Sequence, residues 1–346
     1  MEKIHNDNTF DSNVTQTALI IAAAKLGVEP VSLKMESVSG GYSRNRRSLV
    51  YNDDNWIFVK EVDTSLLTSE GEEERWWLRK DYLCVNTLRP LVPNLVPEWS
   101  QLDESGHVLM MTSYRSVDGW LWTIPEEPQL QHDYIQAVIA AIKQLEAVTF
   151  DEMTIEALKL QPFFRDELAL DDGLSLIITN QVVRDKLLAK YAMMIDDVNL
   201  VHLRKPLLEM KILLGDKAAL RVLSLKAQQL IEQPNDAFGH CDVRSDNLTY
   251  NKNTGVVKFV DWNWASMTPK GLGATEFLIN VARNGIDVMP WISELNIEAL
   301  ASVIGYYARR CLKDQRAPGN TVRDVQALSA AVSFSLYVAA TEAKRS

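Results

Sequence analysis

The sequence predicts an α+β protein of two lobes, a small β-rich N-terminal lobe over residues 1–114 and a larger, mostly helical C-terminal lobe over 115–346. Two observations predict this division. Short alternating or apolar segments dominate before Tyr114, whereas apolar residues recur with helical periodicity after it. A brief return of strand pattern at 237–260 places a small β unit among the later helices. Clefts between lobes are favoured ligand sites, so a ligand site is expected there.

Strands and two helices account for the N-terminal lobe. Ser12 or Asn13 can cap an opening helix over 14–26. Segments of β-forming residues bounded by turn residues predict strands over 32–38, 48–51, 56–62 and 107–113. A second helix is predicted over 69–88, because apolar residues recur along it and Pro90 then ends it.

Helical periodicity continues through most of the C-terminal lobe. It predicts long helices over 131–148, 155–169, 176–196 and 206–232. The strands within 237–260 come next, and helices then return and continue to the C-terminus.

The composition excludes several classes of protein. The 346-residue chain carries 46 acidic and 36 basic residues, and this net charge of −10 argues against a protein that coats nucleic acid or an anionic membrane. Three scattered cysteines indicate a reducing compartment. The N-terminus lacks a signal-peptide pattern, and the apolar stretch 18–24 is far shorter than the ~20 residues of a membrane span. We therefore expect a cytoplasmic protein of unspecified oligomeric state, with neither nucleic acid nor membrane as a partner.

The residues that indicate chemistry lie between 238 and 262. The segment His240-x-Asp242-x-x-x-x-Asn247 is followed by a hairpin turn and an apolar strand that ends at Asp261-Trp262. This spacing is typical of kinase-type phosphotransferases, in which one carboxylate lies beside the acceptor hydroxyl. A second carboxylate and a carboxamide then hold Mg²⁺ on the nucleotide phosphates. The alternative is purely structural, with Asp242 and Asn247 as turn residues and Asp261 as a helix cap.

With these residues the sequence resembles the aminoglycoside phosphotransferase and choline kinase-like family, which shares the protein-kinase fold. The Asp-Trp pair at 261–262 fits this family better than protein kinases, which carry Asp-Phe-Gly. The resemblance covers about residues 14–340 and implies that Asp242 is the catalytic base. It also implies that Asn247 and Asp261 are metal ligands and that His240 supports the loop backbone.

Lys60, near the end of the apolar strand 56–62, is similar to the family's strand lysine, which reaches the α- and β-phosphates. The alternative is an edge-strand lysine in solvent. The functional lysine needs an acidic partner from the following helix, where four residues compete: Glu70, Glu72, Glu73 and Glu74. Glu74 shares a face with Trp77 and Asp81 and faces inward best, so it is the predicted partner.

Two further segments complete the predicted nucleotide site. Gly40, Gly41 and Ser43 lie between the first two strands, where glycines let backbone N–H groups approach phosphates. A plain hairpin turn is the alternative for this segment. The resemblance also implies a hinge after the last strand of the first lobe, with adenine bonded to the backbone between Met111 and Ser113.

Arg244 and Glu276 are additional candidates near the predicted base. A cation two residues after Asp242 can offset the charge that develops on the transferring phosphoryl group. The alternative is a surface arginine paired with Asp246 or another carboxylate. Many relatives carry an aspartate shortly after the Asp-Trp pair. Here the corresponding stretch contains Glu276, which either replaces that aspartate or leaves the support missing.

The expected function is ATP- or GTP-dependent and Mg²⁺-dependent phosphoryl transfer to a hydroxyl of a small molecule, such as an aminoglycoside or another cationic metabolite. The resemblance places the acceptor pocket in a helical insert at about 150–235. Acidic pairs at 166–167, 171–172 and 196–197 would attract a cation, although solvated helix ends are the alternative. The alternative function is that of a catalytically silent nucleotide-binding or scaffold protein with the same fold.

Overall fold

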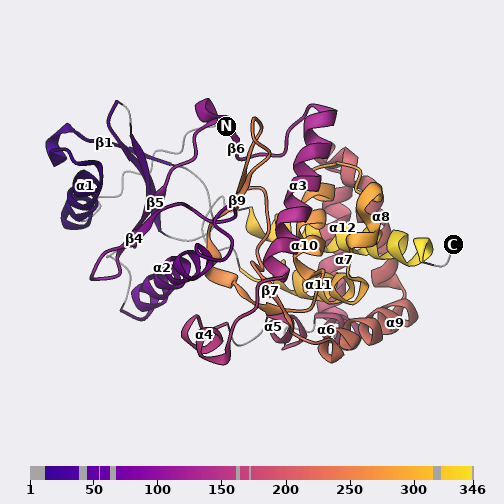
Figure 1. The fold of residues 1–346 in the computed structure, drawn as a ribbon. Helices are drawn as coiled ribbons and strands as arrows, with labels where there is room; N and C mark the ends of the chain where they lie inside the picture. The colour runs from indigo at the N-terminus through magenta and orange to yellow at the C-terminus, as the bar shows by residue number, and fades with distance from the viewer. Residues whose placement is uncertain are drawn as a thin grey trace. The chain divides into compact units, whose positions relative to one another are not determined.

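The computed structural model describes seven stretches of the chain: residues 12–38, 45–53, 55–62, 68–160, 164–170, 173–314 and 321–344. Contacts divide the chain into two compact units (Figure 1). The first unit comprises Met1–Ala137 and Asp246–Asn263, and the second comprises Val138–Ser245 and Trp264–Ser346. We describe each unit by itself.

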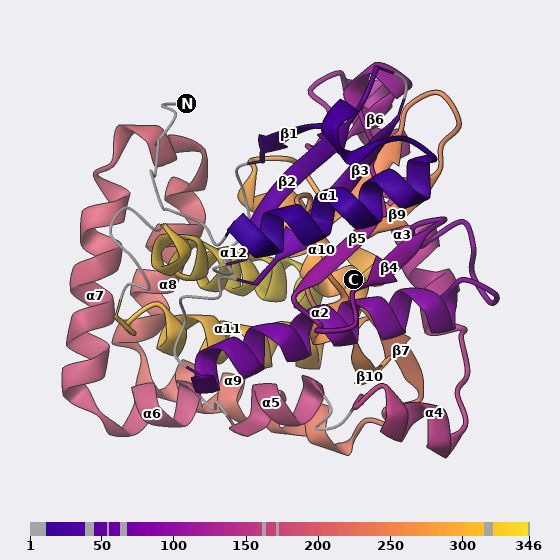
Figure 2. The ribbon, with the colours of Figure 1, turned by 90° about the vertical axis from the view of Figure 1, so that its left-hand side faces the viewer.

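A five-stranded antiparallel sheet forms the centre of the first unit, with strand order β1-β2-β3-β5-β4. Its strands are short: β1 (Lys34–Ser37), β2 (Arg46–Tyr51), β3 (Trp56–Glu61), β4 (Ser100–Leu102) and β5 (Val108–Thr112). Helix α1 (Ser12–Leu26) crosses one face of this sheet (Figure 2). Helix α2 (Thr68–Leu88) lies between β3 and β4 in the sequence. The expected elements are therefore present, and β4 is an additional strand that the sequence did not predict.

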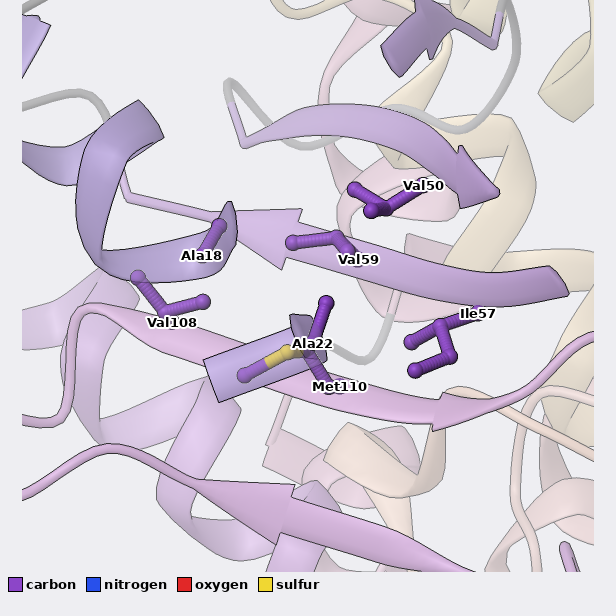
Figure 3. Close-up of a cluster of buried hydrophobic side chains, with 7 residues drawn as sticks. All are labelled: Ala18, Ala22, Val50, Ile57, Val59, Val108 and Met110. Atoms are coloured by element: carbon purple, nitrogen blue, oxygen red, sulfur yellow. The ribbon is translucent and has the colours of Figure 1, made fainter. Parts of the chain in front are cut away.

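Side chains of β5 alternate between two apolar clusters on opposite faces of the sheet. Val108 and Met110 pack with Ala18 and Ala22 of α1 (Figure 3). The small alanines, one helical turn apart, let α1 approach the strands closely. The intervening residues of β5 pack against Leu78 of α2. Because strand side chains alternate in this way, each residue of β3 and β5 belongs either to the α1 face or to the α2 face.

A smaller antiparallel sheet in the first unit contains the predicted hairpin, in the order β6-β8-β9. Strands β8 (Leu248–Asn251) and β9 (Val257–Phe259) pair with each other, and β6 (Trp120–Leu121) pairs with β8. The Asn251 side chain accepts hydrogen bonds from two backbone amides of the turn, and Gly255 closes it at φ 73°. Because β6 joins this hairpin, the first unit extends beyond residue 114 and includes residues 246–263.

Helices dominate the second unit: α4 (Glu152–Ala157), α5 (Phe164–Leu170), α6 (Gly173–Thr179), α7 (Gln181–Ile195), α8 (Arg204–Gly215), α9 (Lys217–Gln228), α10 (Leu272–Arg283), α11 (Ile297–Arg310) and α12 (Val322–Ala343). Helix α3 (Pro128–Glu146) contributes to both units. A two-stranded antiparallel sheet pairs β7 (Ala237–Gly239) with β10 (Ser266–Thr268). None of the described helices is long and apolar enough to cross a membrane.

Short 3₁₀ helices connect several of these elements in both units: η1 (Pro30–Ser32), η2 (Ser116–Asp118), η3 (Val198–Leu203), η4 (Gln229–Glu232), η5 (Trp262–Trp264) and η6 (Met289–Glu294).

Three of the long helices expected from periodicity are each divided into two. The segment 206–232 breaks at Asp216, whose side chain accepts from the amides of Ala218 and Ala219 and so caps α9. Asn180 caps α7 in the same way, because its side chain accepts from the amide of Val183. Helix α6 therefore ends before Asn180. The segment 155–169 is divided between α4 and α5. Local capping explains the first two breaks. Periodicity alone cannot reveal them, because the apolar stripe continues across them.

Candidate active site

Lys60 of β3 forms a buried ion-pair cluster with two aspartates of the first unit. Its Nζ lies 2.8 Å from Asp81 Oδ2 and 3.0 Å from Asp261 Oδ1. The Lys60 and Asp81 side chains are 6% and 1% exposed, and Asp261 is 22% exposed. Burial disfavours the ammonium, but the two carboxylates outweigh it and raise the pKa of Lys60. The cluster therefore keeps a charged ammonium in a dry site.

The sheet register explains why Lys60 faces α2. Lys60 lies directly opposite Leu109 of β5, and cross-strand neighbours share a face of the sheet. Leu109 packs against Leu78 of α2, and Asp81 follows Leu78 by about one helical turn. Asp81 thus comes from the α2 face that covers Lys60.

The predicted partner of Lys60 was Glu74, and this prediction is wrong. The charges that raise the pKa of Lys60 belong to Asp261 and Asp81. Glu74 lies about two helical turns before Asp81 on the same side of α2. Periodicity therefore identified the correct face of the helix, but the turn of α2 that meets Lys60 depends on how the helix packs on the sheet.

Asp261 and Asn247 lie at the two ends of the β8–β9 hairpin. The backbone amide of Val260 donates to the carbonyl of Asn247 at 2.9 Å, which holds these ends together. Asp261 has φ 67°, a left-handed conformation that costs a non-glycine residue about 1–3 kcal/mol. Such strain persists only where neighbouring contacts enforce it, and it clusters at functional sites.

Two contacts from Asp261's neighbours hold the strained turn. The Trp262 amide donates to Asp81 Oδ1 at 3.2 Å, so Asp81 binds both Lys60 and the backbone that follows Asp261. The Asn263 side chain donates to Asp261 Oδ1 at 2.6 Å. The Trp262 ring is fully buried and packs edge-on against Phe259. Asp81 thus links the strand lysine to the predicted metal ligand, a role that sequence analysis did not assign to it.

The donor set of the first unit fits a divalent cation that is shared with phosphate. Asp261 offers a partly exposed carboxylate, and Asn247, 4% exposed, offers a carboxamide. Among the described residues, no three or more His, Cys, Asp or Glu side chains gather into a metal cage. Mg²⁺ is commonly bound by one or two carboxylates together with substrate phosphates, so a cage of protein ligands is not required.

The predicted catalytic loop lies in the second unit, directly after β7. His240 is 1% exposed, and Cys241, 4% exposed, takes the left-handed conformation at φ 60°. The Cys241 thiol is oriented toward the Gly239 carbonyl, with 3.5 Å between sulfur and oxygen. The buried Cys241 side chain thus fills space beneath the loop backbone. Its backbone redirects the chain between His240 and Asp242.

Arg244 binds the predicted base. Its Nη1 lies 2.7 Å from Asp242 Oδ1 and 3.0 Å from Oδ2, so one guanidinium nitrogen contacts both carboxylate oxygens. The two side chains are 21% and 25% exposed, which makes this pair more accessible to water than the Lys60 cluster. The arginine is thus paired with a carboxylate, as the second interpretation of Arg244 required, and that carboxylate is Asp242 itself.

Glu276 of α10 lies beneath the same loop. Its carboxylate accepts a hydrogen bond from the Val243 amide, and its Oε2 is enclosed. Burial raises the pKa of Glu276 well above its usual value, and the charge of Asp242 raises it further. The Val243 hydrogen bond and Arg244 oppose this rise. Of the two possibilities left by the sequence, the structure therefore shows a carboxylate that supports the loop.

The loop and α10 enclose a small polar cavity. Its volume is about 20 Å³, enough for one water molecule. The lining includes polar side chains from three helices and the loop: Asp242, Arg244, Glu276, Asn280, Arg283, Tyr307 and Ser329. Burial and the nearby Glu276 raise the pKa of the Tyr307 phenol, so Tyr307 stays neutral at physiological pH. This cavity is too small for an acceptor molecule.

The remaining predicted nucleotide residues are only partly described. Gly40, Gly41 and Ser43 lie in the segment 39–44, outside the described residues. Met111, 1% exposed, lies in β5 between β3 and β4, and its side chain joins the apolar cluster on the α2 face. Ser113 is the first residue after β5 and is half-buried. The hinge role of Met111 and Ser113 stays a prediction.

The first unit contains a small antiparallel sheet, and the second unit consists mostly of helices. This division is the architecture of a two-lobed kinase-like protein. No protein-family model and no curated protein sequence matches the chain. Among solved structures, the ethanolamine kinase of Plasmodium vivax aligns at a TM-score of 0.52 and 13% identity, covering 94% of this chain and 92% of that one. The choline kinase LicA of Streptococcus pneumoniae aligns at 0.50 and 12% identity, covering 92% and 99%.

The chain therefore has the fold of choline and ethanolamine kinases, as the motif resemblance predicted. At 12–13% identity, the similarity concerns the fold, a small-molecule phosphotransferase fold, over almost the whole chain. The substrate and the roles of individual residues must be argued from the site itself.

Proposed function

We propose that this protein is an ATP- or GTP-dependent and Mg²⁺-dependent kinase that phosphorylates a hydroxyl of a small molecule. One observation carries the proposal. Lys60 of β3 is paired with Asp261 of the motif, although 201 residues separate them in the sequence. A structural turn residue or an edge-strand lysine in solvent would not need this contact. A nucleotide site needs both charges at one point.

The exposures of the two aspartates suggest different roles for them. Asp81 is 1% exposed and also binds the Trp262 amide, so it is the fixed partner of Lys60. Asp261 is 22% exposed and is the more accessible carboxylate. In the proposed reaction, Lys60 orients the α- and β-phosphates of the nucleotide, and Asp261 with Asn247 would hold Mg²⁺. The bound Mg²⁺ would neutralise charge on the phosphates.

Asp242 is the proposed base in the second unit. The acceptor hydroxyl oxygen attacks the terminal phosphorus, the bond to the nucleoside diphosphate breaks, and the hydroxyl proton moves to the Asp242 carboxylate. Arg244, two residues further on, holds that carboxylate in one orientation through Nη1. Its positive charge also favours the negative charge that develops on the phosphoryl group.

The acceptor is proposed to be a hydroxylated small molecule, with an aminoglycoside or another cationic metabolite as the finer expectation. The acidic pairs of the insert give this finer class little support. Asp166 is paired with Arg165, and Asp197 caps η3 through the amide of Asn199. The pair at 171–172 lies outside the described residues. These contacts match the helix-end interpretation of the acidic residues.

A substrate screen tests the proposal directly. The purified chain is incubated with Mg-ATP or Mg-GTP and a panel of hydroxylated compounds that includes cationic, neutral and anionic members, and nucleoside diphosphate release is measured. We expect turnover with at least one acceptor and none without Mg²⁺. Hits confined to neutral or anionic compounds would contradict only the expectation of a cationic acceptor and would leave the proposed kinase activity in place. Tight Mg-nucleotide binding without any turnover would support the silent nucleotide-binding protein instead.

A further inference from the structure

The β8–β9 hairpin contains a buried lysine that the proposed reaction does not use. Lys258 is the middle residue of β9, and its side chain is 5% exposed. Its Nζ donates to the backbone carbonyls of Pro93 and Val96 at 3.0 and 2.9 Å. The same Nζ lies 2.7 Å from Glu98 Oε1. An ammonium group has three N–H donors, so these three acceptors satisfy it completely.

An apolar side chain at position 258 would suit the strand as well as the lysine does. The two neighbours of Lys258 in β9, Val257 and Phe259, are buried apolar residues. Burying an ammonium is unfavourable unless hydrogen bonds compensate it, and replacing a buried ion pair by apolar residues is often neutral or stabilising. The lysine is therefore weak evidence for stability. Its three directed hydrogen bonds indicate a role in fixing the position of the strand.

All three acceptors belong to the connection between α2 and β4, residues 89–99. This connection contains neither strand nor helix, so contacts to its backbone decide where it lies. A fourth contact comes from the main chain, because the Phe259 amide donates to the Leu95 carbonyl at 2.8 Å. The connection continues directly from α2, and the Val92 amide donates to the Leu88 carbonyl at 2.8 Å. Strand β9 is thus bound to the chain that follows α2.

The hairpin is therefore attached to α2 and its continuation at two places. Beyond the end of β9, the Trp262 amide donates to Asp81, which also binds Lys60. Within β9, Lys258 binds the connection. Asp261 lies between these two attachments in the sequence. Because a strand held at two points cannot tilt about either one, the attachment at Lys258 sets how Asp261 is presented beside Lys60.

Glu98 extends this network to the residue after the predicted hinge. Its Oε2 accepts from the Tyr114 hydroxyl at 2.8 Å, while its Oε1 binds Lys258. Burial raises the pKa of Glu98, but the hydrogen bonds from Lys258 and Tyr114 outweigh burial and lower the pKa below its usual value. Glu98 is thus charged at neutral pH. Tyr114, 6% exposed, directly follows Ser113, so the network joins the hairpin to the segment where adenine is expected.

We propose that Lys258 is a positioning residue for the metal site, which holds the β8–β9 hairpin against residues 93–98 so that Asp261 and Asn247 meet a metal ion on the nucleotide phosphates. This inference rests on the proposed function, because it requires that the two hairpin residues bind Mg²⁺ beside Lys60. In this role Lys258 acts through the hairpin and contacts neither metal nor nucleotide. A merely structural lysine would change stability and leave the metal dependence of nucleotide binding unchanged.

Calorimetric titration of the full chain with ADP, in the presence and absence of Mg²⁺, tests the proposal. Lys258→Met removes the three donors and keeps a long apolar side chain. We expect the affinity for Mg-ADP to fall by about 10-fold, because residues that orient metal ligands typically contribute 10- to 100-fold to metal affinity. The affinity for metal-free ADP should change by less than about twofold, since the pair of Lys60 with Asp81 is retained.

Two variants of Glu98 test the same network without removing the buried lysine. Glu98 is 56% exposed, so neither substitution introduces a misfit in the core. Glu98→Ala removes one of the three acceptors, and its loss of Mg-ADP affinity should be smaller than that of Lys258→Met. Glu98→Gln keeps an acceptor oxygen and should recover most of this loss. If Lys258→Met does not fold, the two Glu98 variants decide the outcome: equal, wild-type Mg-ADP affinities in both would overturn the proposal.

Thr249→Val is the matched control in the same hairpin. Thr249 lies directly opposite Lys258 and is fully buried. Its hydroxyl donates to the Leu121 carbonyl of β6 at 3.0 Å, and not to residues 93–98. The variant should lower the melting temperature, because a buried hydrogen bond is lost, and leave the affinity for Mg-ADP within about twofold of wild type.

Hydrogen exchange adds a readout that needs no ligand. The Phe259 amide, which binds the Leu95 carbonyl, should exchange faster in Lys258→Met than in the wild type and in Thr249→Val. A folded Lys258→Met chain with wild-type exchange at Phe259, with wild-type Mg-ADP affinity, or with equal losses in the presence and absence of Mg²⁺ would overturn the positioning role alone. A wild-type chain without any Mg²⁺-dependent nucleotide binding would overturn the proposed function itself.

Discussion

The Lys60 cluster and the Asp242–Arg244 pair both place opposite charges in contact, yet they are built differently. Three distant segments of the first unit supply Lys60, Asp81 and Asp261, and the Lys60 and Asp81 side chains are 6% and 1% exposed. In contrast, Asp242 and Arg244 are two residues apart in one loop and are 25% and 21% exposed. Long-range packing fixes the first group, whereas a strained loop and contacts to α10 position the second.

This difference has an energetic consequence. Charges in a dry site interact strongly. Removing one partner strongly lowers the free energy of unfolding, because the other charge stays buried and uncompensated. Removing one partner of a partly solvated pair lowers the free energy of unfolding only a little, because water can replace the missing partner. Substitutions in the Lys60 cluster should therefore damage both stability and function, whereas substitutions in the Asp242 loop should damage function with little effect on stability.

The largest expected effect is on turnover, at Asp242. If it takes the hydroxyl proton, Asp242→Asn should lower kcat by ~10²–10⁴ while the affinity for Mg-nucleotide is nearly unchanged. Its free energy of unfolding should change by less than about 1 kcal/mol, because the pair with Arg244 is partly solvated. Steady-state kinetics and urea unfolding check both statements. Unchanged turnover would remove Asp242 from the mechanism.

The next effect is on stability, at Asp81. Asp81→Ala leaves Lys60 buried with one carboxylate fewer and frees the Trp262 amide, so unfolding free energy should fall by about 3–5 kcal/mol. Asp118→Ala is the matched control in the same unit. Asp118 pairs with Arg115 at 2.9 Å but is 48% exposed, so its loss should cost about 0–1 kcal/mol. Equal losses in the two variants would contradict the contrast between buried and exposed pairs.

A third prediction compares the two proposed metal ligands. Asp261→Ala should abolish Mg²⁺-dependent nucleotide binding, whereas Asn247→Ala should weaken it, because only the carboxylate carries charge. Calorimetric titration with Mg-ATP measures both. Wild-type affinity in the Asp261 variant would refute its assignment as a metal ligand.

Arg244 should show a smaller effect that is confined to catalysis. Arg244→Ala should lower kcat more than it raises the KM for nucleotide, because the contact with the phosphoryl group strengthens in the transition state. Arg244→Lys should recover part of the rate, since a point charge replaces part of the guanidinium's role. A folded alanine variant with wild-type kcat would leave Arg244 as an ion-pair residue only.

The smallest effect concerns pH and Glu276. A carboxyl group whose pKa is raised by folding binds its proton more tightly in the native state, so its contribution to stability falls as pH rises above the unfolded pKa. The Glu276→Gln variant carries a side chain that does not titrate, so it does not lose stability in this way as the pH rises. The melting temperature of the variant minus that of wild type should therefore increase from pH 5 to pH 8. A difference that is constant with pH would show that Glu276 does not titrate between these values in the folded protein.

Several parts of the fold and the site could be predicted from the sequence. Turn residues around short apolar segments identified β2, β3 and the β8–β9 hairpin, because these signals are local. Breaks such as the one at Asp216 escaped prediction, since the apolar stripe of α8 continues into α9 and only the capping contact reveals the end. The strand β6 also escaped, because its two residues gain strand structure only by pairing with β8.

The sequence by itself determined which residue types the site contains: the motif from His240 to Asp261, the strand lysine and the inward face of α2. Only the tertiary structure decided that Asp81, and not Glu74, meets Lys60, and that Glu276 and Asn280 meet the loop. The physical reason is the same in both cases. Periodicity specifies a helix face, but the turn of that face that contacts a distant strand or loop depends on packing between segments far apart in the chain.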